Sequence, residues 1–413
     1  MLNCEPEREP SVKIRLTIIS GPDLGREFIF EGHDTFLVGR TPDSHFRISD
    51  EVAYFSRRHF LLEFNPPRCR LIDLESRNGT LLNGVRVTST DVRDGDEIGV
   101  GTTVFKVAFL ASEAGDAETA ELSPPAIVSD NTVDYLLFPT TFPGYRIVGE
   151  LGRGGMGVVY RATSERDGAP VALKSIVPSG AAGRKQIERF LRECQILDQL
   201  RHPNIVEFRE VGEAADIIFL AMELVDGPDL GVWLREKGPL DVPTAIRIAC
   251  QFLGGLAQAH AQGFVHRDVK PGNILLGRSG DKRIAKLADF GIARVYETSK
   301  ISGLTLQGDI GGTPAYMAPE QVTHYRLVLP AADQYSAAAT LYRMLTDCYI
   351  HDLPRDLGAQ ISQILTAEPI SIRKRRPDIP IGLAEVIHKA LHRDPAERYP
   401  DVLAFRKELK PFA

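Results

Sequence analysis

The sequence contains few cysteines and no long apolar run. Its 413 residues include five cysteines, which are scattered, odd in number and never spaced as CxxC. This pattern argues against a disulfide framework and a structural zinc site, and it is typical of a reducing compartment. The first residues, MLNCEPEREPSVK, carry no apolar signal core, and no uncharged apolar run reaches the ~18 residues of a transmembrane helix. We therefore expect a cytoplasmic chain without a membrane segment.

The chain also lacks an excess of positive charge. Its 49 basic and 55 acidic side chains leave a net charge of −6, which gives no reason to expect nucleic acid or an acidic membrane surface as a partner. A basic run at residues 373–376 precedes a proline and is predicted to be a solvated face or loop. The length predicts two or three domains, and 43% hydrophobic with 25% charged residues is typical of a globular protein.

Residues 12–110 are predicted to form an all-β sandwich. Short apolar strands alternate here with turn signals, and no helical period is sustained. The strand segments are KIRLTII, REFIF, TFLV, HFLLEF, CRLIDL, TLLN and TVFKVAF. The turn signals are Gly21-Pro22, Asn65-Pro66, Asn78-Gly79, Asn83-Gly84 and Asp94-Gly95.

The rest of the chain is predicted to form a linker and a second, bilobal domain. Residues 111–143 are acidic, small and punctuated by prolines, as in a linker. Residues 144–410 begin with strands up to Val177 and become helical beyond Arg184, as in TAIRIACQFLGGLAQAHAQG and LAEVIHKALHR. The expected fold class is therefore multidomain, with an all-β sandwich followed by an α+β bilobal domain.

A glycine-rich segment opens the second domain. Residues 152–159, GRGGMGVV, fit G-x-G-x-x-G-x-V, a pattern shared with dinucleotide-binding turns. A dinucleotide site needs a helix directly after the glycines, because the pyrophosphate rests on the helix N-terminus. Here the glycines lead into VVYRA, a turn at Asp167-Gly168, and VALK with Lys174. The pattern favours a β-hairpin that covers phosphates, and it argues against an NAD-linked enzyme.

Further motifs follow in a fixed order. HRDVKPGN occupies residues 266–273, DFG residues 289–291 and APE residues 318–320, and Arg398 lies in DPAERYP. Together with the glycine loop and VALK, this set resembles bacterial-type (Hanks-type) serine/threonine protein kinases over residues 145 to about 410. The resemblance implies ATP and Mg²⁺ as cofactors, and Ser/Thr side chains of proteins as substrates. It also implies an ion pair between Arg398 and the Glu of the APE motif.

The resemblance assigns roles to the catalytic residues. Asp268 would orient the substrate hydroxyl and accept its proton, and Lys270 would offset charge on the γ-phosphoryl group. Asn273 and Asp289 would supply oxygen ligands to Mg²⁺. Lys174 would hold the α- and β-phosphates, with Glu193 as its expected ion-pair partner and Glu188 as the alternative. The residues expected to contact ATP are Leu151, Gly152, Gly154, Gly157, Val159, Ala172, Lys174, Glu223, Val225 and Leu275.

Regulation is expected in the segment between the DFG and APE motifs. Arg267, beside the catalytic Asp268, is typical of kinases that are controlled by a phosphate on this segment. The candidate sites are Thr298, Ser299, Ser302 and Thr305. We expect Thr305 to be the regulatory site, with a solvated loop threonine as the alternative.

Two segments depart from the kinase pattern. Ala337 stands where kinases commonly have a glycine, but Asp333 is kept and is expected to brace the catalytic-loop backbone. Residues 347–362, DCYIHDLPRDLGAQIS, are atypical and are expected to reshape the substrate-docking surface.

A second set of motifs falls between the strands of residues 12–110. These motifs are VGRT at 38–41, SRRH at 56–59 and SRNGT at 76–80, and they resemble the forkhead-associated (FHA) domain, a phosphothreonine-peptide binder. The resemblance implies phosphopeptide contacts from Arg40, Ser56, Arg57, Arg77 and Asn78. It gives His59 and Gly39 architectural roles. The alternative is that these residues form ordinary turns and surface charges, which is the better interpretation for Asn83-Gly84.

The two resemblances together predict a kinase joined to a phosphothreonine reader. Threonines of the linker, Thr119 and Thr132, or Thr305 could be autophosphorylated and bound by the FHA domain. The alternative from another class is a phosphopeptide-binding adaptor with a catalytically silent kinase fold. The presence of Lys174, Asp268, Asn273 and Asp289 argues against the adaptor.

Overall fold

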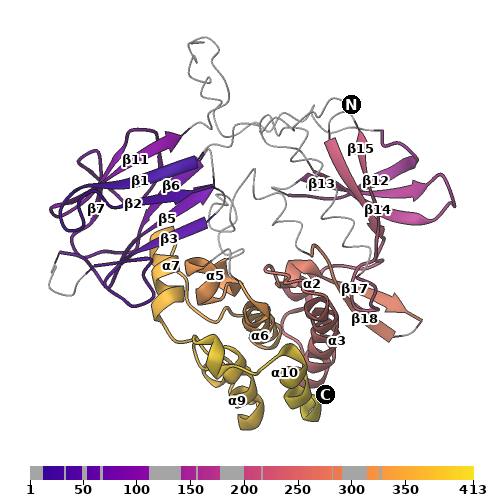
Figure 1. The fold of residues 1–413 in the computed structure, drawn as a ribbon. Helices are drawn as coiled ribbons and strands as arrows, with labels where there is room; N and C mark the ends of the chain where they lie inside the picture. Colours follow the sequence, from indigo (N-terminus) through magenta and orange to yellow (C-terminus); the bar gives the residue numbers. More distant parts are fainter. Residues whose placement is uncertain are drawn as a thin grey trace.

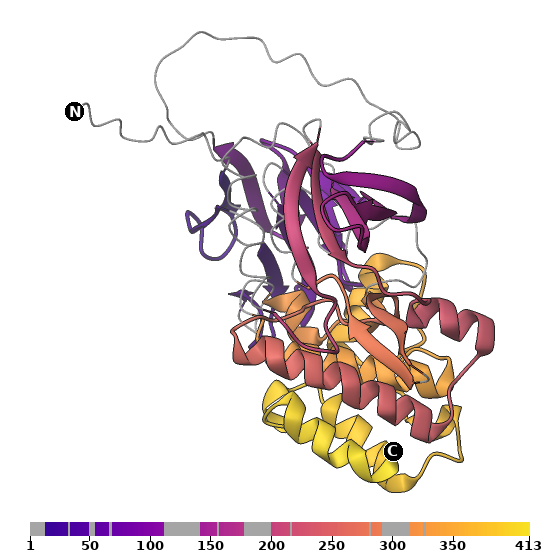
Figure 2. The same ribbon diagram turned by 90° about the vertical axis from the view of Figure 1, so that its right-hand side faces the viewer.

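The computed structural model describes residues 13–31, 34–48, 54–65, 68–110, 141–154, 157–176, 200–214, 217–280, 282–290, 314–324 and 328–413. Within these ranges the chain forms three parts (Figure 1). We call residues 13–110 the sandwich, residues 141–223 the small lobe and residues 229–413 the helical lobe. The sandwich and the small lobe both lie against the same side of the helical lobe (Figures 1 and 2).

The sandwich consists of two sheets. One has the order β2-β1-β11-β10-β7-β8 and the other β4-β3-β5-β6-β9. The first comprises β1 (Lys13–Ser20), β2 (Glu27–Phe30), β7 (Thr80–Leu82), β8 (Val85–Val87), β10 (Glu97–Val100) and β11 (Thr103–Leu110). The second comprises β3 (Asp34–Gly39), β4 (Phe46–Arg47), β5 (Arg58–Asn65), β6 (Arg68–Asp73) and β9 (Ser89–Val92). The expected all-β sandwich is confirmed, and the short strands β4, β8, β9 and β10 are additions to the seven expected strands.

The described residues of the small lobe form an antiparallel sheet with the order β12-β13-β14-β16-β15. Its strands are β12 (Tyr145–Gly154), β13 (Gly157–Ser164), β14 (Pro170–Ile176), β15 (Phe208–Ala214) and β16 (Ile217–Glu223). One face carries a small core that includes Phe142, Val171, Leu173 and Phe219. The strands expected between Tyr145 and Val177 are therefore present, ending at Ile176.

The helical lobe contains one hairpin and a set of helices. The hairpin is formed by β17 (Ile274–Ser279) and β18 (Lys282–Leu287). The α-helices are α2 (Leu230–Lys237), α3 (Val242–Ala261), α5 (Pro319–Thr323), α6 (Pro330–Thr346), α7 (Leu357–Thr366), α8 (Ile372–Arg375), α9 (Ile381–Ala390) and α10 (Val402–Leu409). The 3-10 turns are η1 (Pro271–Asn273), η2 (Pro314–Tyr316), η4 (Pro395–Glu397) and η5 (Lys410–Phe412).

The central helix α3 shows why this lobe folds as the sequence predicts. Asp241 caps its N-terminus by accepting a hydrogen bond from the Thr244 amide, and Pro243 occupies the first turn, where it costs no helical hydrogen bond. Ala249, Phe252, Leu253 and Leu256 are fully buried along one stripe. The helix therefore forms the middle of the main apolar core of this lobe.

The basic run at residues 373–376 lies in and just after α8. Arg376 donates to the carbonyl oxygens of Leu240 at 2.7 Å and Leu345 at 3.0 Å, and Arg375 pairs with Asp352. These two cations therefore tie segments of the helical lobe together, whereas the sequence suggested a solvated face. No helix among the described residues is long and apolar enough to cross a membrane.

The sandwich packs on the helical lobe through a shared apolar cluster, which we call the interdomain cluster. It consists of Leu37, Leu61, Ile72 and Leu74 of the sandwich with Met317, Val322, Ile361, Ile364 and Leu365 of the helical lobe. Strand β3 contacts α5 and strand β6 contacts α7, and their sheet lies beside both helices in Figure 1. This contact was not predicted from the sequence, although the atypical segment 347–362 contains the start of α7.

Candidate functional site

The HRDVKPGN segment forms a loop between α3 and β17, and its polar side chains gather around Asp268. The Lys270 ammonium nitrogen lies 2.8 Å from Asp268 Oδ2. Asn273 Nδ2 donates to the backbone oxygen of Asp268 at 2.8 Å and to its Oδ2 at 2.9 Å. Val269 and Ile274 are at most 1% exposed and anchor the loop in the core. The three polar side chains are therefore held in one place by the apolar residues around them.

Asp333 braces the backbone of this loop from α6. Its side chain is fully buried, and its two oxygens accept hydrogen bonds from the amides of His266 and Arg267, both at 2.7 Å. His260 Nε2 lies 2.7 Å from the same carboxylate. Arg267 has φ of 67°, in the left-handed region that non-glycine residues rarely adopt, so these bonds help to hold a strained conformation. The expected brace is confirmed, and Ala337 does not disturb it.

Lys174, which is buried, and the partly exposed Asp289 form an ion pair between the two lobes. Lys174, on β14, is 7% exposed, and its ammonium nitrogen lies 2.8 Å from Asp289 Oδ1. Burial acts to raise the pKa of Asp289, but Lys174, His266 and Lys270 outweigh it and lower the pKa below its usual value. The carboxylate is therefore charged at neutral pH. Glu193 and its alternative Glu188 lie outside the described residues, so their pairing with Lys174 stays a prediction.

The glycine-rich segment forms a β-hairpin. Strand β12 ends at Gly154 and β13 begins at Gly157, with Gly152 opposite Val159 in the antiparallel register. Gly157 has φ of 140°, which favours glycine at this position. The glycines thus lead into a strand and not into a helix. The hairpin expected from the sequence is present, and the dinucleotide-binding alternative is excluded.

The residues predicted to contact adenine come from three elements. Ala172 lies on β14 opposite Met222 of β16, and Leu275 lies on β17 in the helical lobe. Val225 follows β16 in the segment that joins the lobes, and its side chain lies close to Gly277, where a Cβ would be 2.8 Å from Val225 Cγ1. The Glu223 carboxylate accepts a hydrogen bond from Lys286 at 2.7 Å, across the two lobes. Leu151 is 52% exposed, at the open edge of the hairpin.

The donor set near Asp268 fits a hard cation. No group of three His, Cys, Asp or Glu side chains that could hold a metal occurs among the described residues. Mg²⁺ does not need one, because it keeps several waters and takes one or two protein oxygens. Asn273 uses its amide nitrogen on Asp268, so its amide oxygen can face a cation, and Asp289 offers a charged carboxylate. These two residues therefore suit Mg²⁺.

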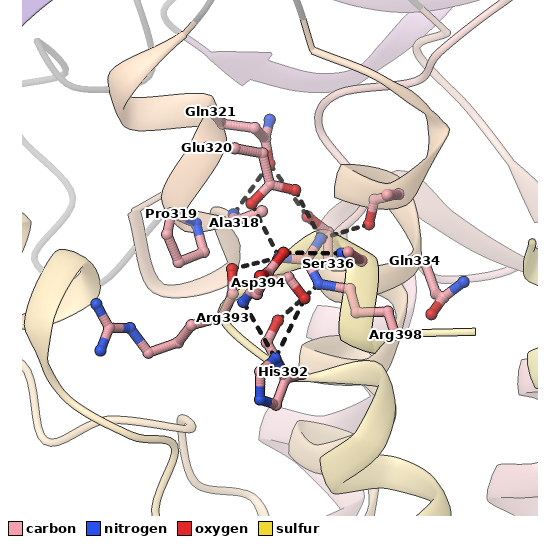
Figure 3. Close-up of polar contacts among 12 residues, drawn as sticks. Ala318, Pro319, Glu320, Gln321, Gln334, Ser336, His392, Arg393, Asp394 and Arg398 are labelled. Carbon is pink, nitrogen blue, oxygen red and sulfur yellow. Dashed lines mark hydrogen bonds and ion pairs between the residues drawn. The ribbon is translucent and has the colours of Figure 1, made fainter. Parts of the chain in front are cut away.

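The APE motif is fixed by a buried ion pair (Figure 3). Arg398 is 4% exposed, and its two terminal nitrogens lie 2.6 and 2.9 Å from the Glu320 carboxylate oxygens. The same guanidinium donates to the backbone oxygens of Ala331, His392 and Arg393. The expected pair of Arg398 with Glu320 is confirmed. The candidate phosphorylation sites Thr298, Ser299, Ser302 and Thr305 lie outside the described residues.

In the sandwich, the residues predicted to bind phosphopeptide come together on neighbouring loops. The Arg77 amide donates to Ser56 Oγ at 3.0 Å, and Asn78 Nδ2 donates to the Tyr54 carbonyl at 2.9 Å. The Arg40 amide donates to the Arg57 carbonyl at 2.8 Å. Arg57, Arg77 and Asn78 are exposed, and Arg40 and Ser56 are half-buried. Three arginines, a hydroxyl and an amide thus lie on contiguous loops, a set suited to an anion.

Gly39 and His59 hold these loops in position. A Cβ on Gly39 would lie 2.3 Å from the Arg57 carbonyl oxygen, so a side chain there would separate the strands that carry Arg40 and Ser56. His59 is fully buried, and its Nδ1 accepts a hydrogen bond from the Ser56 amide at 2.9 Å. Burial lowers the pKa of His59, so the ring remains neutral and Nδ1 can accept. Both residues therefore have the architectural contacts that the sequence suggested.

Arg86 is an additional cation that the sequence analysis did not single out. It lies on β8, opposite Leu81 of β7. Its guanidinium lies over Gly79, where a Cβ would be 2.4 Å from Arg86 Nε. Because Gly79 directly follows Asn78, Arg86 is close to the same cluster. The Asn83-Gly84 hairpin in the sequence could have indicated it, since a tight turn brings residues of adjacent strands together.

Comparison with known families agrees with this geometry. A model described as the protein kinase domain matches residues 145–405, which is more than half of the chain. The chain belongs to the protein kinase family. A model described as the FHA domain matches residues 36–101, within the sandwich. From here on, the sandwich is called the FHA domain, and the two lobes together the kinase domain.

Several curated bacterial kinases are similar to this chain. Serine/threonine-protein kinase PkaA of Streptomyces coelicolor is 37% identical over 266 residues, which cover 62% of this chain and 47% of that protein. Serine/threonine-protein kinase pkn3 of Myxococcus xanthus is 35% identical, covering 64% and 49%. PknF of Mycobacterium tuberculosis is 38% identical, covering 65% and 56%. The chain thus spans about half the length of the curated relatives it matches.

Two solved structures resemble different extents of the chain. The PknI kinase domain of Mycobacterium tuberculosis is 30% identical with a TM-score of 0.52, covering 66% of this chain and 98% of that one. Rad53 residues 1–466, solved in complex with AMP-PNP, is 22% identical with a TM-score of 0.52, covering 96% and 99%. The second likeness is one of fold alone, and it extends over the FHA domain as well as the kinase domain.

Proposed function

We propose that the chain is a serine/threonine protein kinase that transfers the γ-phosphoryl group of ATP to protein hydroxyls, with an FHA domain that binds phosphothreonine peptides. The proposed limits are 12–110 for the FHA domain, 111–143 for the linker and 144–410 for the kinase domain. The observation that carries the kinase proposal is the gathering of Asp268, Lys270 and Asn273 beside the ion pair of Lys174 and Asp289. Two further observations support a common site: the Ala288 amide, next to Asp289, donates to the Asn273 carbonyl at 2.9 Å, and Lys270 helps to lower the pKa of Asp289.

The proposed reaction needs positioning and charge neutralisation more than covalent chemistry. Asp268 accepts the proton of a Ser or Thr hydroxyl as its oxygen forms a bond to the γ-phosphorus. The bond from that phosphorus to the bridging oxygen breaks, and ADP leaves with the electron pair. Lys270 offsets charge on the transferred group, and Lys174 holds the α- and β-phosphates, with Glu193 as its proposed partner. Mg²⁺ held by Asn273 and Asp289 would neutralise phosphate charge.

The nucleotide site is proposed to lie between the lobes. The adenine ring would pack between Ala172 and Leu275, with hydrogen bonds to the Glu223 carbonyl and the Val225 amide. The hairpin that carries Leu151, Gly152, Gly154, Gly157 and Val159 would cover the phosphates. Because glycine has no Cβ, the backbone of the hairpin could approach the phosphate oxygens closely, whereas a side chain at these positions would prevent this approach.

The first test is phosphoryl transfer from labelled ATP with Mg²⁺ to the chain itself and to casein. Asp268→Asn keeps the shape of the loop but removes the proton acceptor, so the rate should fall about 100-fold or more. Glu385→Gln, an equivalent change at an exposed helical residue, should leave the rate unchanged. Mapping the label would locate autophosphorylated residues, and Thr305, Thr119 and Thr132 are the proposed sites.

Two outcomes of this experiment would count against the proposal. If the wild-type chain transferred no label, even after treatment with an activating kinase, the adaptor with a silent kinase fold would become the better interpretation. If label appeared but none on Thr305, Thr119 or Thr132, the FHA domain would have another ligand than these threonines. A self-ligand would otherwise benefit from an effective concentration in the millimolar range across the linker.

The FHA domain is proposed to bind phosphothreonine through Arg40 and Ser56, with Arg57 and Arg77 beside them. Asn78 would bond the peptide backbone, and Arg86 would add positive charge at the same loops. Charge-assisted hydrogen bonds from arginine to phosphate are stronger than neutral ones, so Arg40 should contribute most of the preference for phosphorylated over unmodified threonine.

The test is binding of a peptide library with a central phosphothreonine, measured by fluorescence anisotropy. Arg40→Ala should weaken binding about tenfold to a hundredfold, as expected for a lost hydrogen bond to a charged group. Arg68→Ala, at an exposed position at the other end of β6 from the loop, should bind like the wild type. Equal binding of the unphosphorylated library would show that the cluster does not recognise phosphate.

A further inference from the structure

The sheet of the FHA domain that faces the kinase domain is buried on both sides. Phe36, Val38, Phe60 and Leu62 point into the FHA core, and the alternate residues Leu37 and Leu61 belong to the interdomain cluster. Leu37, Leu61 and Ile72 are fully buried, and Leu74 is 3% exposed. Polar residues usually occupy the outer face of a two-sheet sandwich. An apolar outer face indicates that this sheet is normally covered, here by α5 and α7 of the kinase domain.

Backbone contacts make this interface specific. A Cβ on Gly358, at the start of α7, would lie 2.1 Å from the Asp73 carbonyl oxygen of β6, far inside van der Waals contact. Thr35 Oγ1 of β3 donates to the Thr323 carbonyl of α5 at 3.1 Å, and both residues are at most 4% exposed. The His45 ring lies beside that of His324, with 4.8 Å between centroids. The two domains therefore fit together in a defined register.

On the kinase side, consecutive residues of α5 link the interface to the catalytic loop. Gln321 Nε2 donates to the carbonyl oxygen of Arg267 at 2.8 Å, directly before Asp268. Val322 is part of the interdomain cluster, and Thr323 accepts the hydrogen bond from Thr35. This one short helix thus contacts both the catalytic loop and the FHA domain. A shift of α5 away from the FHA domain would move the support of the catalytic loop.

On the FHA side, Asp73 links the interface to the phosphopeptide loop. Its carbonyl faces Gly358, while its carboxylate accepts hydrogen bonds from Ser76 Oγ at 2.5 Å and Thr80 Oγ1 at 2.6 Å. The Ser76 amide also donates to this carboxylate, at 2.9 Å. These bonds hold the loop that presents Arg77 and Asn78. Asp73 therefore contributes both to the order of the loop that carries Arg77 and Asn78 and to the contact with α7.

We propose that the docked FHA domain is a positioning element of the kinase, and that phosphothreonine-peptide binding raises its catalytic rate. The inference rests on the proposed function. A peptide bound at Arg77 and Asn78 orders the loop held by Asp73, and this favours docking on α5 and α7. Docking in turn keeps α5 against the catalytic loop. The two sites are then coupled through the interface, and a coupling of this kind typically changes an affinity by about 5-fold to 150-fold.

Gly358→Ala is the variant that tests the proposal. The added Cβ must push Asp73 away, because its nearest neighbour is a backbone oxygen that cannot turn aside. Helix α7 itself accepts alanine, since Gly358 is a helical position without positive φ. Gly382→Ala is the matched control. Gly382 is also the second residue of a ten-residue helix, and its Cβ would be 3.5 Å from Phe412, an ordinary contact.

The measurement is the kcat for casein with and without the phosphothreonine library, together with hydrogen exchange of β3, β5 and β6. In the wild type and in Gly382→Ala, the library should raise kcat about fivefold, the lower end of typical coupling. In Gly358→Ala, the three strands should exchange faster, basal kcat should fall, and the stimulation should disappear. Thr35→Val, which removes one interdomain hydrogen bond at constant shape, should reduce the stimulation partly.

The outcomes separate this inference from the proposed function. A wild-type chain that phosphorylates casein and binds the library, but whose kcat the library leaves unchanged, would overturn the inference alone. So would a Gly358→Ala variant with faster exchange in β3, β5 and β6 and wild-type stimulation. Absence of both transfer and peptide binding in the wild type would instead contradict the proposed function, and the inference with it.

Discussion

His351 illustrates how a single buried residue links stability to pH. It lies in the helical lobe between α6 and α7 and is 3% exposed, and neither ring nitrogen has a hydrogen-bond partner among the described residues. Burial lowers its pKa to about 4, against the opposing effect of Glu368, with Arg393 lowering it further and Asp352 raising it. The ring is therefore neutral in the folded chain at pH 7, because burial disfavours the charged form of the imidazole.

The low pKa of His351 predicts a loss of stability in acid. The unfolded chain binds a proton below pH ~6.5, but the folded chain does not until about pH 4. The contribution of His351 to the free energy of unfolding is therefore complete above pH ~6.5. It decreases by roughly 3 kcal/mol as the pH falls to about 4. His351→Leu should flatten this part of the curve, measured by urea unfolding at several pH values. The exposed His392→Leu serves as control, and an unchanged slope in His351→Leu would contradict the assignment.

At the scale of elements, the short helix α5 has more contacts than its five residues suggest. Its Glu320 pairs with Arg398, Gln321 contacts the catalytic loop, and Val322 and Thr323 contact the FHA domain. A helix this short is not stable by itself. Its position must therefore come from these tertiary contacts, which include the ion pair with the buried Arg398.

Breaking the Glu320–Arg398 pair should destabilise the helical lobe. Arg398→Met leaves the Glu320 carboxylate and three backbone oxygens without their donor, at a cost of about 3–5 kcal/mol for a buried pair. The double variant with Glu320→Gln should recover part of the loss, because no unpaired charge remains. The free energy of unfolding of both variants is measured by chemical denaturation, from the unfolding transition of the kinase domain.

An exposed ion pair supplies the control for this prediction. Asp378, whose side chain is 67% exposed, pairs with Arg376 at 3.2 Å. Asp378→Asn should cost under ~1 kcal/mol, as is usual for surface pairs. If Arg398→Met lowered the free energy of unfolding no more than Asp378→Asn does, the Glu320–Arg398 pair would not be the contact that fixes the position of α5.

Some elements of the structure could be predicted from the sequence, and others could not. The catalytic loop, the glycine hairpin and the Asp333 brace were all predicted, because each depends on residues at fixed short spacings or on a motif of definite order. The strands β4, β8, β9 and β10 were missed because two to four residues are too few to show a clear period. Arg86 was missed because the Asn83-Gly84 turn was interpreted only as a turn, and the pairing of the strands on either side of it was not followed.

At the scale of the whole molecule, the docking of the FHA domain is what the sequence analysis missed. Its strands were assigned by their apolar segments and turns, and no contact of the sandwich with the second domain was predicted. The signal was nevertheless present, since FLV at 36–38 and FLL at 60–62 are continuous apolar runs and not alternating ones. Such runs are typical of strands covered on both faces. The partner surface could not be inferred, because its residues lie more than 200 positions further along the chain.

The buried outer face has a consequence for how copies of the chain can assemble. Nothing in the contacts of Leu37, Leu61 and Ile72 with Val322 and Ile361 requires both sides to belong to one molecule. The same surfaces are satisfied when two chains exchange their FHA domains reciprocally, which gives a closed two-fold dimer at little cost in contacts. The length of the linker then decides between the two arrangements, because it sets the local concentration of a chain's own FHA domain. Shortening that linker would turn a self-contained molecule into an obligate pair, in which each kinase domain carries the other chain's phosphothreonine reader.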